Sequence, residues 1–168
     1  MKFAFLALLL ILPLSVAAQE FPKMRAGLWQ TTTMTRAAKT ADKPAPHVTT
    51  ICIDDSVQKL MMQMAQGMMR GMCSKHELRV SGATVTGDAI CEMMGSRIST
   101  RSVMKFSGDT SYHTDAHMIY DPPLDGRKEA DTVVDGKYTG ACPAGMSPGD
   151  LRLPGGKTIN LKALTPGR

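Results

Sequence analysis

Apolar and polar residues alternate through two pairs of neighbouring segments, which predicts antiparallel strands with one buried face. Residues 76–80 and 83–91 flank a turn at Ser81-Gly82. Residues 96–106 and 110–120 flank a three-residue turn at 107–109. Because successive side chains of a strand point to opposite faces, these turns bring apolar faces together, Val80 and Leu78 among them. The second register also sets Arg101 opposite Asp115.

Four further segments have the β-branched and aromatic content that favours strands: residues 27–35, 47–53, 129–134 and 136–142. The fold class expected from this pattern is mainly β (α+β). We predict a curved antiparallel sheet or incomplete barrel with one amphipathic helix packed on it.

The helix is predicted over residues 56–72, where apolar residues recur at helical spacing. Asp55 and Gln58 have the spacing of a capping box, and Asp54-Asp55 suits a helix N-terminus better than a catalytic carboxylate pair. At about 100° per residue, an apolar stripe faces the sheet and polar residues face solvent. The stripe contains Val57, Leu60, Met61, Met64, Met68 and Met72, the opposite face contains Lys59, Gln63, Gln66 and Arg70, and Met62 and Met69 lie on one flank.

The N-terminus has the layout of a secretory signal peptide over residues 1–18, with Lys2, an apolar run and small residues before Gln19. The run is too short to span a bilayer comfortably, so we expect no stable transmembrane anchor after cleavage; a retained anchor helix is the alternative. We expect one disulfide-linked β-rich domain over residues 19–142. Residues 143–168 form a loosely held tail rich in proline and glycine, with a short element at 157–164.

The four cysteines agree with export, because an even number in a secreted chain indicates two disulfides. Three pairings are open. We favour Cys52–Cys73, which bracket the helix, and Cys91–Cys142, which tie the last strand back. The C-x₂₋₄-C spacing of a zinc site is absent from the sequence. The net charge of +5 is mild and does not indicate nucleic-acid binding.

Methionine is the most unusual feature, with six in residues 60–73 alone. Thioethers are soft ligands, so Met62, Met69, Met93 and Met94 are candidate Cu(I) or Ag(I) ligands. The alternatives are core packing, which we favour, and an adaptable surface for a partner.

Other candidate site residues carry weaker signals. His113 could join Asp115 in half of a metal site, with a third ligand such as His76 or His47; His117 lies about 13 Å from His113 on a regular strand. A solvated strand face is the simpler interpretation. Trp29 is a candidate ligand-stacking residue, and a core anchor is the alternative.

The order FPKMRAGLWQTTT, TTICID, helix, cysteine-bearing hairpin and GKYTGAC resembles a bacterial exported family catalogued as domain of unknown function 3617. The resemblance covers roughly residues 21–142 and includes Gly27-Leu28-Trp29 and Gly140-x-Cys142. It implies export and a β-rich domain, and it supplies no activity and no catalytic residues. The methionine-rich helix and the tail depart from it.

We therefore expect a periplasmic or secreted, non-enzymatic protein without a cofactor. It would bind an envelope protein or an apolar ligand through the sheet face or the Met-rich helix. Periplasmic Cu(I) or Ag(I) binding is the second hypothesis. A hydrolase whose catalytic groups meet only in the fold is the third, since the sequence contains no G-x-S-x-G, H-E-x-x-H or P-loop motif.

The signal-peptide interpretation predicts cleavage after Ala18. N-terminal sequencing of the protein recovered from the extracytoplasmic fraction should begin at Gln19. Recovery of a chain that retains residues 1–18 would contradict the prediction and support an anchor helix.

Overall fold

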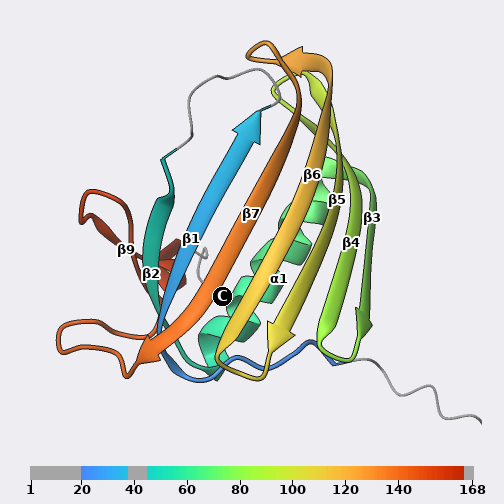
Figure 1. The fold of residues 1–168 in the computed structure, drawn as a ribbon. Coiled ribbons are helices and arrows are strands. Elements are labelled where there is room, and N and C mark those ends of the chain that lie inside the picture. Colours follow the sequence, from blue (N-terminus) through green and yellow to red (C-terminus); the bar gives the residue numbers. More distant parts are fainter. Residues whose placement is uncertain (1–19, 38–44, 165–168) are drawn as a thin grey trace, which may run out of the picture.

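The computed structural model describes residues 20–37 and 45–164 (Figure 1). The predicted signal peptide at residues 1–18 and its cleavage site lie outside the described residues.

A single antiparallel sheet of nine strands accounts for most of the described chain (Figure 1). The spatial order is β3-β4-β5-β6-β7-β1-β2-β8-β9. The elements are β1 (Gly27–Ala37), β2 (His47–Ile53), α1 (Asp55–Met72), β3 (Cys73–Ser81), β4 (Thr84–Met93), β5 (Ser96–Ser107), β6 (Ser111–Leu124), β7 (Arg127–Gly140), β8 (Asp150–Arg152), β9 (Thr158–Asn160) and the 3₁₀-helix η1 (Leu161–Leu164).

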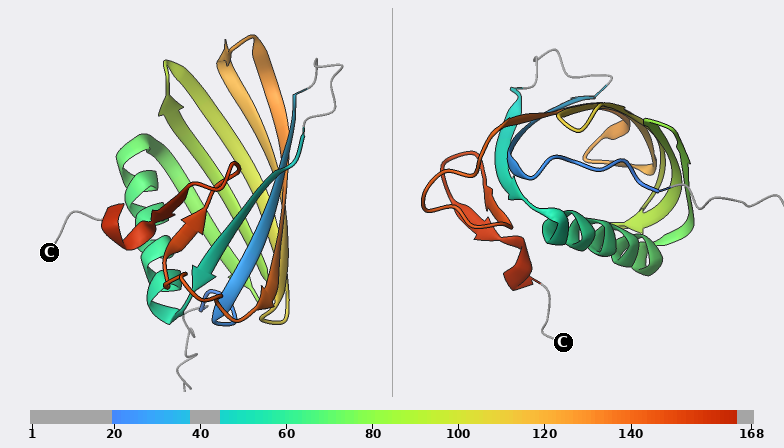
Figure 2. Two further views of the ribbon diagram at one scale, coloured as in Figure 1. Left: turned by 90° about the vertical axis from the view of Figure 1, so that its left-hand side faces the viewer. Right: turned by 90° about the horizontal axis from the view of Figure 1, so that it is seen from below.

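The sheet curls into an incomplete barrel, and α1 lies across its open side (Figure 2). Seen from below, the strands form a C-shaped wall and the helix bridges the gap between β2 and β3. The predicted fold class, a curved antiparallel sheet with one helix packed on it, is confirmed.

Both predicted hairpins form, with registers shifted by two residues. Val80 pairs with Val85 rather than with Ala83. Arg101 pairs with His117 and makes its ion pair with Asp88, at 3.1 Å, so the expected Arg101–Asp115 pair was wrong. A shift of two residues leaves every side chain on its predicted face, because the side-chain period of a strand is two.

The helix and its N-cap each lie one residue earlier than predicted. Asp54 is the N-cap, and its carboxylate accepts a hydrogen bond of 2.8 Å from the Val57 amide. The predicted capping box of Asp55 and Gln58 does not form. The Gln58 amide instead bonds the N-terminal segment: Oε1 accepts from the Met24 amide at 3.1 Å and Nε2 donates to the Pro22 carbonyl at 3.0 Å.

The helix is also rotated from the predicted orientation. Met68, assigned to the buried stripe, is 62% exposed. Gln66, assigned to solvent, is exposed as predicted and also borders the space beneath the helix. Met61, Met62 and Ala65 border the same space. The helix also contacts η1, whose Leu161 packs against the core.

The core lies at the end of the barrel where β1 begins. Trp29 is fully buried, stacks on Tyr112 at a centroid distance of 5.9 Å and meets Tyr138 edge-on. Its indole Nε1 donates to the Arg25 carbonyl at 2.8 Å. Trp29 is therefore a core anchor, and it also lines the cavity described below. Gly136 is required here because the Tyr112 ring occupies the space of a side chain at that position.

The disulfides are Cys52–Cys142 and Cys73–Cys91, so the favoured pairing was wrong. An 18-residue helix is about 27 Å long, so Cys52 and Cys73 at its two ends lie far beyond the roughly 7 Å limit between bridged Cα atoms. Cys73 and Cys91 are instead direct partners across β3 and β4. One disulfide lies in the strand that precedes α1 and the other begins the strand that follows it.

The residues after Cys142 are more regular than expected. The chain passes beside β2, where the Gly149 amide donates to the Cys52 carbonyl at 2.8 Å. β8 then pairs with β2 and β9 pairs with β8. The expected short element at 157–164 coincides with β9 and η1.

Two glycine substitutions test this packing. Gly136→Ala should lower the free energy of unfolding by about 1–3 kcal/mol, because the new methyl group collides with the Tyr112 ring. Gly67→Ala, on a helix position with open space around it, should raise it by about 0.5–1 kcal/mol. Urea denaturation of the oxidised protein measures both. A neutral Gly136→Ala would show that Tyr112 does not pack as described.

Candidate functional site

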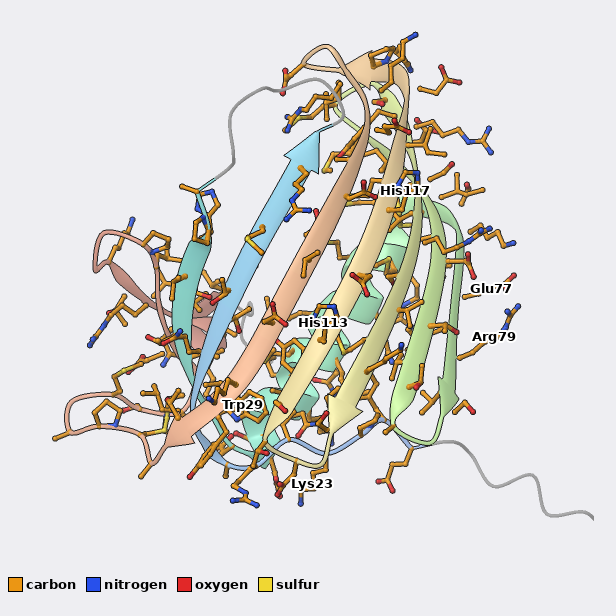
Figure 3. The ribbon with its side chains drawn as sticks, viewed as in Figure 1. Lys23, Trp29, Glu77, Arg79, His113 and His117 are labelled. Carbon is orange, nitrogen blue, oxygen red and sulfur yellow. A yellow bond between two sulfur atoms is a disulfide. The ribbon has the colours of Figure 1, made fainter. Side chains whose placement is uncertain are left out.

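A cavity of about 320 Å³ lies between α1 and the concave face of the sheet. Its walls come from the N-terminal segment, β1, β2, α1, β3, β5 and β6, and Trp29 lies at its lower end (Figure 3). The lining side chains are mostly apolar: Phe21, Met24, Trp29, Thr31, Ile51, Ile53, Gln58, Met61, Met62, Ala65, Gln66, Leu78, Met104, Phe106 and Tyr112. We call this space the inner compartment.

A second space of about 240 Å³ adjoins it under the C-terminal half of the helix. The two share Ala65, Gln66 and Leu78 in their linings. We call this space the outer compartment. Its lining is more polar and includes His76, Thr100 and Ser102. The two volumes together fall within the range of roughly 300–1,000 Å³ that ligand pockets occupy.

On the concave wall, the rows of paired residues that begin at Trp29, Thr31, Thr33 and Thr35 of β1 and run across to β3 contain no Asp, Glu, Lys or Arg among the described residues. Strand pairing and side-chain alternation place one set of residues on this face. On β5 that set is Ile98, Thr100, Ser102, Met104 and Phe106. The charged residues of the same strands, such as Arg101, point to the convex face.

Hydroxyl groups provide the polarity of this wall. Thr35 and Thr132 are hydrogen-bonded to each other at 3.0 Å, and Thr31 lies 3.4 Å from the Tyr112 hydroxyl. Thr114 is 9% exposed, and its hydroxyl has no hydrogen-bond partner among the described residues. A buried hydroxyl without a partner costs about 1–3 kcal/mol, which is unusual for a position with a purely structural role.

One end of the inner compartment is closed by the N-terminal segment. Phe21 packs edge-on against Phe106 at 5.6 Å, and Met24 is buried. Gln58 ties this segment to the helix through the two hydrogen bonds already described. The outer compartment therefore lies at the opposite end from this closure.

A larger hollow of about 450 Å³ lies on the convex face, between Lys75, Arg101 and Ile119. Its neighbouring charged side chains are exposed and ion-paired, and a ligand there would remain solvated on one side. The apolar cavity beneath the helix is therefore the better candidate site, although it is smaller.

The histidines of β6 belong to the convex face (Figure 3). His113 Nδ1 lies 2.7 Å from Asp135, and its Nε2 lies 3.3 Å from Asp115. His117 Nδ1 lies 2.8 Å from Asp131. The hydrogen bond to Asp135 and the charge of Asp115 raise the pKa of His113. The described residues contain no cluster of three or more His, Cys, Asp or Glu suited to a metal ion. His76, the proposed third ligand, lines the outer compartment instead.

The four candidate methionine ligands lie in three places. Met62 lines the inner compartment and Met69 the outer compartment. Met93 and Met94 lie at the turn between β4 and β5, where Met94 is 81% exposed. The Met69 sulfur lies 3.6 Å from the Cys73 sulfur, which is a van der Waals contact because Cys73 is in a disulfide and has no thiol proton. Metal binding by these methionines stays a prediction.

Sequence reasoning missed the residues of the outer compartment. Gln66 was assigned to the solvent face of the helix. His76 shares a strand face with Leu78 and Val80, so alternation alone could have placed it inside. The same alternation places Thr100 and Ser102 on the strand face that contains Met104, so it could have placed them inside as well.

The fold and the cavity define a disulfide-linked incomplete-barrel protein with an uncharged internal site. Two disulfides indicate an oxidising, extracytoplasmic environment. None of the helices in the described ranges combines the length and apolar character that a membrane span requires.

The chain belongs to the family described as Protein of unknown function (DUF3617), whose model matches residues 24–142. The match contains both disulfides, α1 and both compartments apart from Phe21, and ends before β8. No curated protein and no solved structure matches the chain.

The geometry around His113 predicts a pH effect. Its pKa in the folded protein is raised above the unfolded value of about 6.5. The His113–Asp135 pair should therefore stabilise the protein fully below that value, and its contribution should be lost as the pH rises through the folded pKa. Histidine NMR titration should show the raised pKa, and Asp135→Asn should lower it.

Asp131→Asn is the matched control, since Asp131 pairs with His117 rather than with His113. It should leave the His113 titration unchanged. An unaltered His113 pKa in Asp135→Asn would contradict the prediction.

Proposed function

We propose that the protein is an exported, periplasmic binding module that holds one elongated apolar ligand between α1 and the concave face of the sheet. The observation that carries the proposal is the inner compartment, a space of about 320 Å³ with largely apolar walls.

A space of this size is expensive to leave empty. Protein interiors are packed as densely as organic crystals, and cavities cost about 24 cal/mol per Å³. A void of 320 Å³ sealed from solvent would cost on the order of 8 kcal/mol. The cavity is partly open where Ala65, Gln66 and Leu78 are exposed, so its cost when empty is smaller. Water is a poor filling because apolar walls offer it few hydrogen bonds. An apolar ligand would remove this cost.

The walls also suit a site that exists before the ligand arrives. The strands that flank α1 are restrained by disulfides: Cys52–Cys142 joins β2 to the chain after β7, and Cys73–Cys91 joins β3 to β4. In a preformed site the helix does not have to become ordered when the ligand binds, so that entropy cost is avoided. Methionines at 61, 62 and 104 give part of the lining flexible side chains that adapt to a ligand.

We propose binding without catalysis. In the part of the lining that the structure describes, His76 is the one imidazole, and it makes no hydrogen bond to a hydroxyl nucleophile. Nucleophilic catalysis needs such a pair within hydrogen-bond reach.

Filling the junction of the two compartments tests the proposal. Ala65→Phe should abolish the fluorescence enhancement of the uncharged apolar probe N-phenyl-1-naphthylamine, because Ala65 lines both compartments. The wild-type protein should bind the probe at a 1:1 ratio. The melting temperature of Ala65→Phe should stay equal or rise, since the new ring fills a void.

Gln63→Phe is the matched control, because it adds the same ring to an exposed position on the opposite side of the helix. Its probe binding should equal that of the wild type. Absence of probe binding by the wild type, or equal binding by Ala65→Phe, would refute the proposed function.

A further inference from the structure

We infer that the ligand is an uncharged single-chain amphiphile, with its hydrocarbon chain in the inner compartment and a hydrogen-bonding head group, such as an alcohol, amide or glycerol ester, in the outer compartment. The inference rests on the proposed function and adds the chemistry and orientation of the ligand.

The orientation follows from the two ends of the cavity. The inner end is aromatic and is closed by Phe21, Met24 and Gln58, whose amide is already engaged in hydrogen bonds. The other end contains four polar side chains: Gln66, His76, Thr100 and Ser102. The Ser102 hydroxyl donates to the Gly87 carbonyl at 3.4 Å and keeps its acceptor capacity. A chain that enters with its apolar end first leaves its head group beside these four side chains.

Because the concave wall carries no charged side chain in the described rows of paired residues, it favours a neutral head group over a charged one. Gln66, Thr100 and Ser102 offer donors and acceptors but no compensating charge. Gln66 and His76 are exposed, so the head group keeps contact with water, but a carboxylate or ammonium group there meets no opposite charge and gives up part of its hydration to neutral side chains. A neutral head group loses much less and regains it in hydrogen bonds.

Two carboxylates near the outer compartment do not alter this conclusion. Glu77 and Asp88 occur in its lining, but they form a cross-strand pair whose side chains belong to the convex face. Glu77 is engaged by Arg79 at 2.6 Å and by Lys75 at 3.2 Å, and Asp88 by Arg101 at 3.1 Å (Figure 3).

The opposite end offers the competing arrangement. A hollow of about 530 Å³ lies outside the closure, with Lys23, Asp55 and Lys59 around it. Phe21, Gln58 and Met62 line both this hollow and the inner compartment and stand between them. Lys23 is paired with Asp55 at 3.2 Å, which reduces its attraction for an anion. An anionic head group at this end is the arrangement that the experiment must distinguish.

The helix sets the length of the chain. The residues of α1 that line the inner compartment run from Gln58 to Gln66, about 12 Å at 1.5 Å per residue. An extended chain advances roughly 1.2 Å per bond, by analogy with the extended polypeptide. The inner compartment therefore accommodates a chain of about ten carbons.

Displacement of N-phenyl-1-naphthylamine by three C10 amphiphiles tests the head group. Monodecanoylglycerol, decanoate and decyltrimethylammonium share their chain length and differ in charge. At pH 8, with each below its micellar concentration, monodecanoylglycerol should displace the probe at a concentration at least tenfold lower than the other two. In a monoacylglycerol series from C6 to C14, affinity should rise to about C10 and then level off.

Gln66→Glu tests the position of the head group, with Gln63→Glu as the matched control on the exposed side of the helix. A carboxylate at position 66 should weaken monodecanoylglycerol binding about tenfold and improve decyltrimethylammonium binding. Gln63→Glu should change neither. The double variant Thr100→Val/Ser102→Ala should reduce the preference for the glyceride while it preserves binding of the apolar probe.

The outcomes separate the two proposals. If the probe binds but all three amphiphiles displace it equally, or if none does, recognition of a neutral head group is overturned and the proposed function stands. If decanoate is preferred and the preference is lost in Lys59→Gln, the orientation is reversed and the inference is again overturned. If the wild type fails to bind the probe, the proposed function itself fails.

Discussion

The attachment of α1 at both ends is the constraint on which the rest of the structure depends. The sheet curls without closing, so an element must cover its open side, and an 18-residue helix is the cover. The helix is poorly suited to stand alone, because Gly67 and Gly71 lower its propensity and Val57 is its one fully buried residue in the described chain. Helices of this length owe most of their stability to tertiary contacts. Two disulfides restrain the strands that flank this helix. Cys52–Cys142 holds the end of β2 just before it, and Cys73–Cys91 holds the start of β3 just after it.

This restraint explains why a cavity can persist beneath the helix. A helix held only by apolar packing would settle onto the sheet until the void closed, since each cubic ångström of void costs free energy. Here the strand before the helix is bridged to the chain after β7 through Cys52, and the strand after it is bridged to β4 through Cys73. The helix between them therefore spans the opening of the barrel. The methionines then have two environments: Met61 and Met62 line the space, whereas Met68 lies on the outside.

Much of the fold could be predicted from alternation, because alternation is a local property of each strand. It placed Leu78 and Val80 on one face and Glu77 and Arg79 on the other, and a register error of two residues did no harm. The disulfide pairing needed the distance between the ends of the helix, which depends on the whole topology. The rotation of α1 depends on how the helix packs in the whole fold, which its own sequence does not reveal. Met68 was therefore misplaced, whereas Gln66 is exposed as predicted.

The same alternation separates charge from the cavity. On the convex face, ion pairs such as Arg101–Asp88 and His117–Asp131 run across the strands, where water screens them and each contributes little to stability. Exposed charges on a sheet discourage its pairing with other chains. On the concave face, the partner positions are taken by threonine, serine, alanine and apolar residues. The side-chain period that builds the sheet thus also determines what the cavity can hold, because a wall without formal charge favours a neutral occupant over an ion. Selectivity for the proposed ligand would in this sense be a consequence of strand geometry, refined by the few polar groups at the outer compartment.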